Sequence, residues 1–345
     1  MITNKKILSF GEILLRMASP GYTRLFQDNV LCTSFCGGEA NVAVSLSIFG
    51  LDSAFLTKLP ENDIGQAAIN SMRYFGVDIS KIVRGDGRIG LYYLEKGASQ
   101  RASKVIYDRS YSAIAMAAKS DFDWNSIFEG VDWFHWTGIN PALSDGMTEI
   151  CMDACQIAKK KGITISCDLN YRKNLWSTEK AKAIMSQFML YVDVCVANEE
   201  DADKVLGIKA FDNDVESGKL NKSGYEYVAK EICDNYGCKY VAITLRESYS
   251  ASNNGWGAMI YDANSGESYL SKEYNIHIID RVGSGDSFTA GIIYALITGM
   301  TAADAVEFAT AASCLKHSIE GDYNRVSVAE VMNLVNGSGN GRVMR

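Results

Sequence analysis

The chain has 345 residues, of which 47% are hydrophobic and 22% are charged, and it contains only three prolines. This apolar content excludes an intrinsically disordered chain, which could not bury enough surface to offset its loss of conformational entropy. At about 150 residues per domain, the length allows one large domain or two. The formal net charge of −7 disfavours nucleic acid and membrane surfaces as partners, because a negative surface repels their phosphates. A small anionic substrate in a locally positive pocket is still possible.

Nine cysteines are scattered along the chain without two pairs at the spacing of a zinc site. Their odd number and irregular spacing favour free, buried thiols over a disulfide framework, which is typical of a reducing compartment. Nowhere do 18 apolar residues follow one another. We therefore expect a soluble, cytoplasmic protein.

Short apolar runs alternate with amphipathic stretches along the chain. The apolar runs predict buried strands at residues 7–10, 54–59, 131–136, 163–168, 192–197 and 240–245. The amphipathic stretches predict helices at residues 41–49, 64–75, 147–161, 225–236, 287–297 and 301–316. This alternation predicts an α/β fold with a mainly parallel sheet covered by helices on both faces.

Two early stretches interrupt the alternation. Residues 13–35 lack a convincing helix, and residues 90–107 read as two strands with no helix between them. We expect both stretches to form antiparallel strands that project from the main body. Residues 211–221 predict an exposed excursion, and residues 336–345 predict a frayed tail.

The segment at residues 280–286 reads D-R-V-G-S-G-D and precedes an apolar helical pattern. Its glycines let backbone N–H groups converge at the start of that helix, where the helix dipole also favours an anion. Gly283, Ser284 and Gly285 therefore predict an anion hole for a transferring phosphoryl group. Asp286 is placed to take a proton from an attacking hydroxyl. An ordinary glycine turn with a favourable first-turn acid remains an alternative for this motif alone.

A second glycine turn, C-G-G-E-A-N-V-A at residues 36–43, leads into another helix and carries the amide of Asn41, which can bind hydroxyls. Together the two segments resemble the ribokinase-like (PfkB) carbohydrate kinases, and the likeness covers nearly the whole chain. The resemblance implies one kinase domain over residues 1–345, with a doubly wound α/β core and a small β-sheet lid from about 13–36 and 88–110. It also implies transfer of the γ-phosphoryl group of ATP to a sugar hydroxyl with Mg²⁺, and a homodimer formed through the lid.

The resemblance assigns roles along the chain. Asp286 would be the catalytic base, and the amides at residues 283–285 the anion hole. The residues implied to bind the nucleotide are Asn198, Thr244, Gly283 and Gly285. Arg246 stands where the family has glycine, so the backbone must approach the nucleotide differently there.

Metal ions are also implied by the resemblance. Asp201 stands where the family has a glutamate that acts on Mg²⁺, and neighbouring Glu200 is the alternative ligand. In this family a monovalent cation lies near the position matched by Asp280, so a monovalent ion is a further candidate cofactor.

Several cations favour an acidic substrate. Arg16 stands where relatives for neutral sugars carry an aspartate, and arginine suits a carboxylate better than a polyol. Four further motifs are G-L-Y-Y at residues 90–93, Y-D-R at 107–109, N-Y-R at 170–172 and G-D-Y-N at 321–324. They resemble the 2-keto-3-deoxygluconate kinases within the family. The implied substrate contacts are Gly38, Asn41, Tyr92, Tyr107, Arg109, Arg172 and Asp322.

The expected activity is therefore ATP-dependent phosphorylation of the terminal hydroxyl of 2-keto-3-deoxygluconate. The residues leave the galactonate epimer open, and a fructokinase- or tagatose-type kinase for a neutral sugar is the alternative. A sugar-acid sensor that kept the fold without catalysis is disfavoured by the intact D-x-x-G-x-G-D segment.

Overall fold

The computed structural model describes residues 5–198, 200–210 and 222–337, so the predicted excursion at 211–221 and the last eight residues of the predicted tail lie outside it. Within these ranges one large sheet contains β1 (Lys6–Phe10), β4 (Asp52–Leu56), β9 (Trp133–Thr137), β10 (Thr164–Asp168), β11 (Val194–Ala197), β12 (Tyr240–Ser248), β13 (Asn253–Asp262), β14 (Glu267–Leu270) and β15 (Tyr274–His277). The strand order is β14-β13-β12-β11-β10-β9-β1-β4, and β15 also pairs with β13.

The six strands from β4 to β12 are parallel, as the alternation of strands and helices predicts. The sheet then continues into β13, β14 and β15, which pair antiparallel and were not predicted. Gly255 and Gly257 interrupt β13, and glycine is a weak strand former, so this strand has little signal in the sequence.

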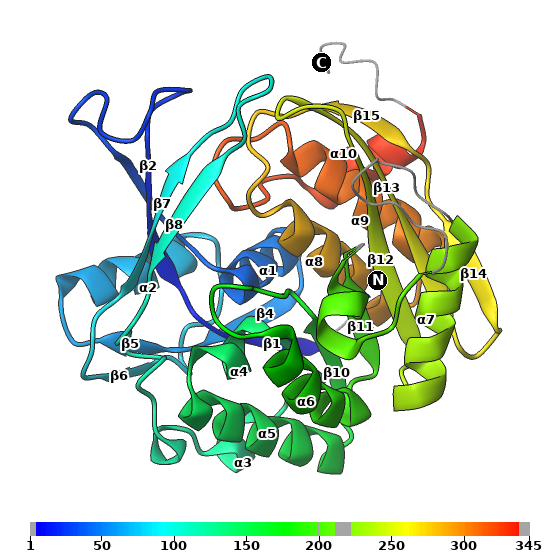
Figure 1. Ribbon diagram of the computed structural model, residues 1–345. Helices are drawn as coiled ribbons and strands as arrows, with labels where there is room; N and C mark the ends of the chain where they lie inside the picture. Colours follow the sequence, from blue (N-terminus) through cyan, green and yellow to red (C-terminus); the bar gives the residue numbers. More distant parts are fainter. Residues whose placement is uncertain (1–4, 199, 211–221, 338–345) are drawn as a thin grey trace.

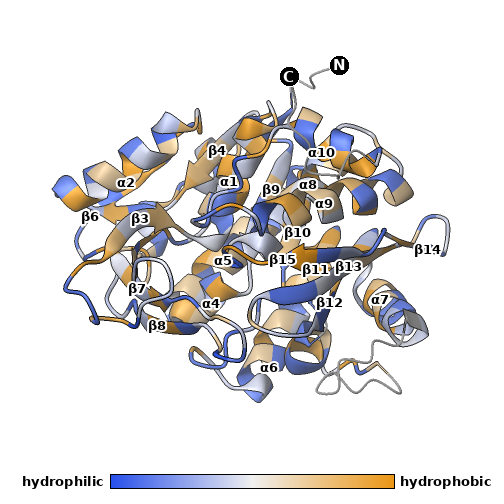
Figure 2. Ribbon diagram, turned by 90° about the horizontal axis from the view of Figure 1, so that it is seen from above, coloured by the Kyte–Doolittle hydropathy of each residue, from blue (hydrophilic) through white to orange (hydrophobic). Residues whose placement is uncertain are grey.

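Helices cover both faces of the sheet, which confirms the doubly wound arrangement. They are α1 (Gly38–Ile48), α2 (Asp63–Tyr74), α3 (Trp124–Ile127), α4 (Ile139–Leu143), α5 (Asp145–Lys160), α6 (Thr178–Phe188), α7 (Lys222–Tyr236), α8 (Ser284–Ile297), α9 (Ala302–Lys316) and α10 (Val328–Val335). Shorter helical turns lie at Lys119–Asp121, Met189–Tyr191 and Ala202–Leu206. One apolar core joins the sheet to α5, α6 and α7, and a second joins it to α1, α8, α9 and α10. Figure 2 shows these two groups of helices from above, on opposite sides of the sheet.

A separate four-stranded sheet forms the lid. Its strands are β2 (Leu14–Ala18), β3 (Cys32–Cys36), β7 (Gly90–Glu95) and β8 (Lys104–Asp108), and they lie in the order β3-β2-β7-β8. Figure 1 shows β2, β7 and β8 standing out from the α/β body. The outer pairs are antiparallel, as expected, but the central pair β2–β7 is parallel, because both strands leave the body in the same direction. A small pair, β5 (Lys58–Pro60) and β6 (Val83–Gly85), lies at its base.

Within the described residues, no helix is long and apolar enough to cross a membrane. All nine cysteines fall in the described ranges and none forms a disulfide. Seven of them are buried, and six of these lie in the core between the sheet and α5, α6 and α7.

Candidate active site

A cavity of about 380 Å³ opens where the parallel strands end and the lid begins. Ligands bind at this edge in open α/β sheets, because loops and helix N-termini converge there. All but one of the predicted site residues line it: Gly38, Asn41, Tyr92, Tyr107, Arg109, Arg172, Asn198, Asp201, Thr244, Gly283, Ser284, Gly285, Asp286 and Asp322. The remaining one, Glu200, is exposed beside the cavity.

The N-terminus of α8 faces this cavity. Gly283 precedes it with φ of 82°, and a Cβ there would lie 2.0 Å from the carbonyl oxygen of Asp322, so only glycine fits. No side chain caps the helix. The first-turn amides have no partner inside a helix, and apart from the N–H of Ser284, which donates to the carbonyl of Arg281 at 3.4 Å, they are available to an anion.

Asp286 is half-buried in the first turn of α8 and contacts the neighbouring helix α1. The Nδ2 of Asn41 donates to its Oδ2 at 2.6 Å. Burial raises the pKa of Asp286 to about 6, and the hydrogen bond from Asn41 acts against this rise. The carboxyl group is therefore ionised at neutral pH but close to titration, which suits a general base.

Glu39 is a buried acid of the same cavity that sequence reasoning did not single out, although it lies within the G-G-x-x-N segment. Thr137 donates to its Oε1 at 2.7 Å. Burial raises the pKa of Glu39 to about 7, and the nearby charge of Asp286 adds to the rise. Two acids with raised pKa values thus lie at the ends of α1 and α8.

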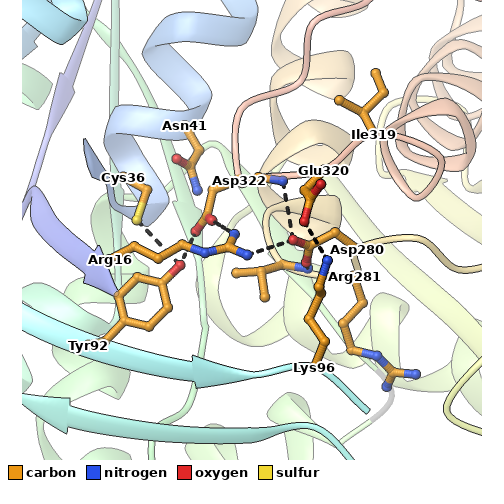
Figure 3. Close-up of polar contacts among 12 residues, drawn as sticks. Arg16, Cys36, Asn41, Tyr92, Lys96, Asp280, Arg281, Ile319, Glu320 and Asp322 are labelled. Carbon is orange, nitrogen blue, oxygen red and sulfur yellow. Dashed lines mark hydrogen bonds and ion pairs between the residues drawn. The ribbon is translucent and has the colours of Figure 1, made fainter. Parts of the chain in front are cut away.

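The prediction that Arg16 faces an acidic substrate is wrong. Its guanidinium is buried in ion pairs with Asp322 and with Asp280, the latter at 2.7 Å (Figure 3). Tyr92 also donates to the Oδ2 of Asp322 at 2.5 Å. The two acids come from distant positions in the sequence, so the pattern around Arg16 gives no sign of them.

Arg109 does face the cavity, at the lid end. Its guanidinium lies over the ring of Tyr107 at 4.7 Å, and its Nε is 3.1 Å from the Oε2 of buried Glu12. That contact is not aligned as a hydrogen bond. Burial raises the pKa of Glu12, and the charge of Arg109 opposes the rise.

Acidic residues gather where β10 and β11 end. Asp201 is buried and accepts backbone N–H groups from Tyr171 at 3.1 Å and Asn198 at 3.3 Å. Burial raises the pKa values of Asp168 and Asp201, and the charge of Arg172 acts against both rises. Within the described ranges, no three His, Cys, Asp or Glu residues are grouped as a complete metal site.

The opposite end of the cavity is basic. Thr244 and Arg246 are two positions apart on β12, and both line the cavity. Arg281 also lines it, from the turn before α8. Arg246 lies over the ring of Trp256 at 5.3 Å, and its Nε has no hydrogen-bond partner. Arg281 donates to the carbonyl of Ala251 at 3.0 Å. Among the described residues neither arginine has a carboxylate within 4 Å, which leaves two cations beside the anion hole.

This fold, with an uncapped helix N-terminus beside a carboxylate in one cavity, is that of a sugar kinase. The chain belongs to the pfkB family of carbohydrate kinases, whose sequence profile matches residues 4–327. The crystal structure of a 2-dehydro-3-deoxygluconokinase from Thermotoga maritima is 48% identical, with a TM-score of 0.93, and covers 96% of this chain and 100% of that one.

Two curated relatives span similar shares of the chain. A 2-dehydro-3-deoxygalactonokinase from Haloferax volcanii is 30% identical, over 96% of this chain and 97% of its own. A 2-dehydro-3-deoxygluconokinase from Bacillus subtilis is 25% identical, over 94% of this chain and 93% of its own. The predicted family and fold are thereby confirmed.

Proposed function

We propose that this protein phosphorylates 2-keto-3-deoxygluconate, also called 2-dehydro-3-deoxygluconate, on its terminal hydroxyl with ATP as donor. The observation that carries the proposal is the single cavity in which Asp286 and the α8 N-terminus meet Tyr107 and Arg109 of the lid. The 48% identity to a kinase of this name supports the choice of substrate.

The reaction needs a proton acceptor and a site for negative charge. As the terminal hydroxyl oxygen forms its bond to the γ-phosphorus, ADP leaves and the hydroxyl proton passes to the Oδ atoms of Asp286. The amides at Gly283, Ser284 and Gly285 then stabilise the charge on the phosphoryl oxygens. Asn41 orients the carboxylate through the hydrogen bond to its Oδ2.

The sugar acid would bind at the lid end of the cavity. Arg109 can grip a carboxylate through its Nη atoms while its Nε stays against Glu12. The ring of Tyr107 packs against the guanidinium of Arg109. The hydroxyl of Tyr92 donates a hydrogen bond to Asp322 in the same cavity. Gly38 lines the cavity beside Asp286, since a Cβ there would lie 3.6 Å from the Oδ1 of Asp286.

The nucleotide would bind at the basic end, with its phosphates near Arg246 and Arg281 and with Asn198 and Thr244 beside them. Two cations without acidic partners favour a polyphosphate, since arginine forms paired hydrogen bonds with phosphate. A side chain at Arg246 would thus take over contacts that a glycine backbone makes in other members of the family.

Magnesium fits the acidic turn between Asn198 and Asp201. Mg²⁺ keeps several waters and binds through one or two carboxylates together with substrate phosphates, so a complete protein cage is not required. Asp201 has both oxygens engaged by amides, which favours contact through water, and exposed Glu200 is the alternative ligand. When bound, the ion would neutralise phosphate charge.

ADP release across a panel of substrates tests the proposal. The panel contains the gluconate and galactonate epimers of the keto acid, together with fructose and tagatose. Preference for either keto acid supports a sugar-acid kinase. The ratio of the kcat/KM values for the two keto acids then assigns the epimer. The galactonate epimer is included because the relative from Haloferax volcanii is a 2-dehydro-3-deoxygalactonokinase. Faster turnover of fructose or tagatose would contradict the proposal.

We also propose a homodimer that pairs the lids of two copies in the cytoplasm. Among the described residues the outer strand β8 has an unpaired edge, and it exposes Ile106 on one face, where a second lid could cover it. The free thiols suit a reducing compartment. Sedimentation of the wild type and of Ile106→Lys tests the dimer, which the added charge should dissociate.

A further inference from the structure

Lys316, the last residue of α9, is fully buried. Its Nζ donates to the carbonyl oxygen of Ile319 at 3.1 Å and lies 3.5 Å from that of Asp280. Among the described residues no carboxylate oxygen lies within 4 Å of it. A lysine is almost never fully buried without compensation for its charge. Here the compensation comes from backbone carbonyls, with carboxylates at longer range.

The two carbonyls belong to turns that both reach the active site. The 279–283 turn leads into α8 and the anion hole, and the 317–322 turn delivers Asp322. The turns are also joined by the N–H of Ile279, which donates to the carbonyl of His317 at 2.8 Å. The N–H of Gly321 donates to the Oδ2 of Asp280 at 3.2 Å. The ammonium of Lys316 therefore lies between the two turns, at the point where the 279–283 turn positions the start of α8 and its anion hole.

The charges at this junction leave no place for a second small cation. Burial lowers the pKa of Lys316, whereas the charges of Asp280 and Asp322 raise it. Arg16 is already paired with both of these acids, as Figure 3 shows. An additional cation would be repelled by Lys316 and Arg16 and would compete for the same oxygens. The residues around Asp280 thus do not fit the dissociable monovalent cation that the sequence resemblance implies.

We propose that the ammonium of Lys316 is a built-in monovalent cation, which takes the place of a dissociable one and ties the 279–283 turn to the 317–322 turn. Carbonyl oxygens bind K⁺ by replacing its hydration shell, and an ammonium group with three donors can satisfy the same oxygens. Lys316 is then a positioning residue for the anion hole. The rate predictions rest on the proposed kinase activity, but the stability predictions do not.

The test compares the wild type with Lys316→Ala, which leaves space for an ion, and with Lys316→Met, which fills that space without charge. Lys160→Ala is the matched control, because Lys160 also ends its helix but is exposed. Each protein is held in tetramethylammonium chloride, whose cation is too large for the site. KCl or NH₄Cl then replaces it at constant ionic strength. Thermal unfolding and ADP release are both measured.

The wild type and the control should melt and turn over equally in all three salts. Lys316→Ala should lose about 10²-fold in rate in tetramethylammonium, since a small displacement of catalytic groups has such an effect. Potassium or ammonium should restore much of that rate and raise its melting temperature, whereas Lys316→Met should respond to neither ion. A wild type that needs K⁺ for activity or for stability would overturn the proposal, even if neither variant folds. So would a folded Lys316→Ala that does not respond to the ions. A wild type with no kinase activity would refute the proposed function alone, because the melting measurements still report on the cation.

Discussion

The hydrogen bond from Asn41 to Asp286 sets the pH range in which the proposed base can act. Because Asp286 must be ionised to accept a proton, its pKa of about 6 predicts that kcat/KM falls as the pH drops below this value. Asn41→Ala removes the donor that lies 2.6 Å from the carboxylate. The ionised form loses stabilisation, so the acid limb of the pH profile should move upward.

The size of the shift follows from the contact. A hydrogen bond to a charged group contributes about 1.5–3 kcal/mol, and 1.36 kcal/mol corresponds to about one pH unit, so the limb should move by about one to two units. At pH 6 the variant should be about 5- to 50-fold slower than the wild type from this cause alone. Near pH 9, where the carboxyl is ionised in both proteins, this part of the difference should vanish.

The assay is ADP release under kcat/KM conditions from pH 5 to 9. Ser45→Ala is the matched control, because the Oγ of Ser45 donates to the carbonyl of Asn41 at 2.8 Å in the same buried helix without touching Asp286. It should lower stability and leave the limb in place. An unmoved limb in Asn41→Ala, in a protein that remains folded, would refute the assignment of Asp286 as the titrating base.

Three further predictions address the two ends of the cavity and its buried ion pairs. Asp286→Asn should lower kcat by about 10²- to 10⁴-fold while calorimetry still shows binding of both substrates, and near-normal turnover would exclude it as the base. Arg109→Ala should raise KM for the keto acid far more than for ATP, and Arg246→Ala should do the reverse; equal effects in either variant would contradict the division of the cavity. Arg16→Met leaves two buried acids without their partner and should lower the free energy of unfolding by about 3–5 kcal/mol in urea titrations. A loss below about 1 kcal/mol would show that these ion pairs do not support the fold.

The sequence predicts the parts of this fold that depend on local pattern. The parallel strands are continuous apolar runs because both faces of the sheet are covered, and α5 and α9 begin at Ser144 and Thr301, whose side chains cap them. The helix α6 was missed, although Ser177 caps it in the same way. Its apolar face is interrupted by charged and polar residues, so the pattern is weak.

The candidate site was predictable where its residues lie in short motifs. Gly283 and Asp286 are three positions apart, and the need for glycine before a helix start can be read from the chain. Arg16 shows the limit of such reasoning, because its partners lie 264 and 306 positions away. Lys316 likewise carries no local sign that its ammonium would be buried between two turns. Long-range partners decide whether a cation is available to a ligand, and the pattern around it does not.

The same distinction explains how an acidic chain can bind two anions in one cavity. Arg16 is neutralised by two acids, so in the proposed function the carboxylate of the keto acid is assigned to Arg109 instead. Among the described residues Arg109 has one ion-pair partner, Glu12, whose burial raises its pKa and whose contact with the guanidinium is poorly aligned. A substrate carboxylate at the Nη atoms would therefore neutralise the positive charge of Arg109 more fully, which a neutral sugar cannot do. At the other end Arg246 and Arg281 have no acidic partner among the described residues, so the more highly charged polyphosphate is favoured there. The two ends differ in how much positive charge remains unpaired, and we propose that this difference directs the two substrates to opposite sides of Asp286.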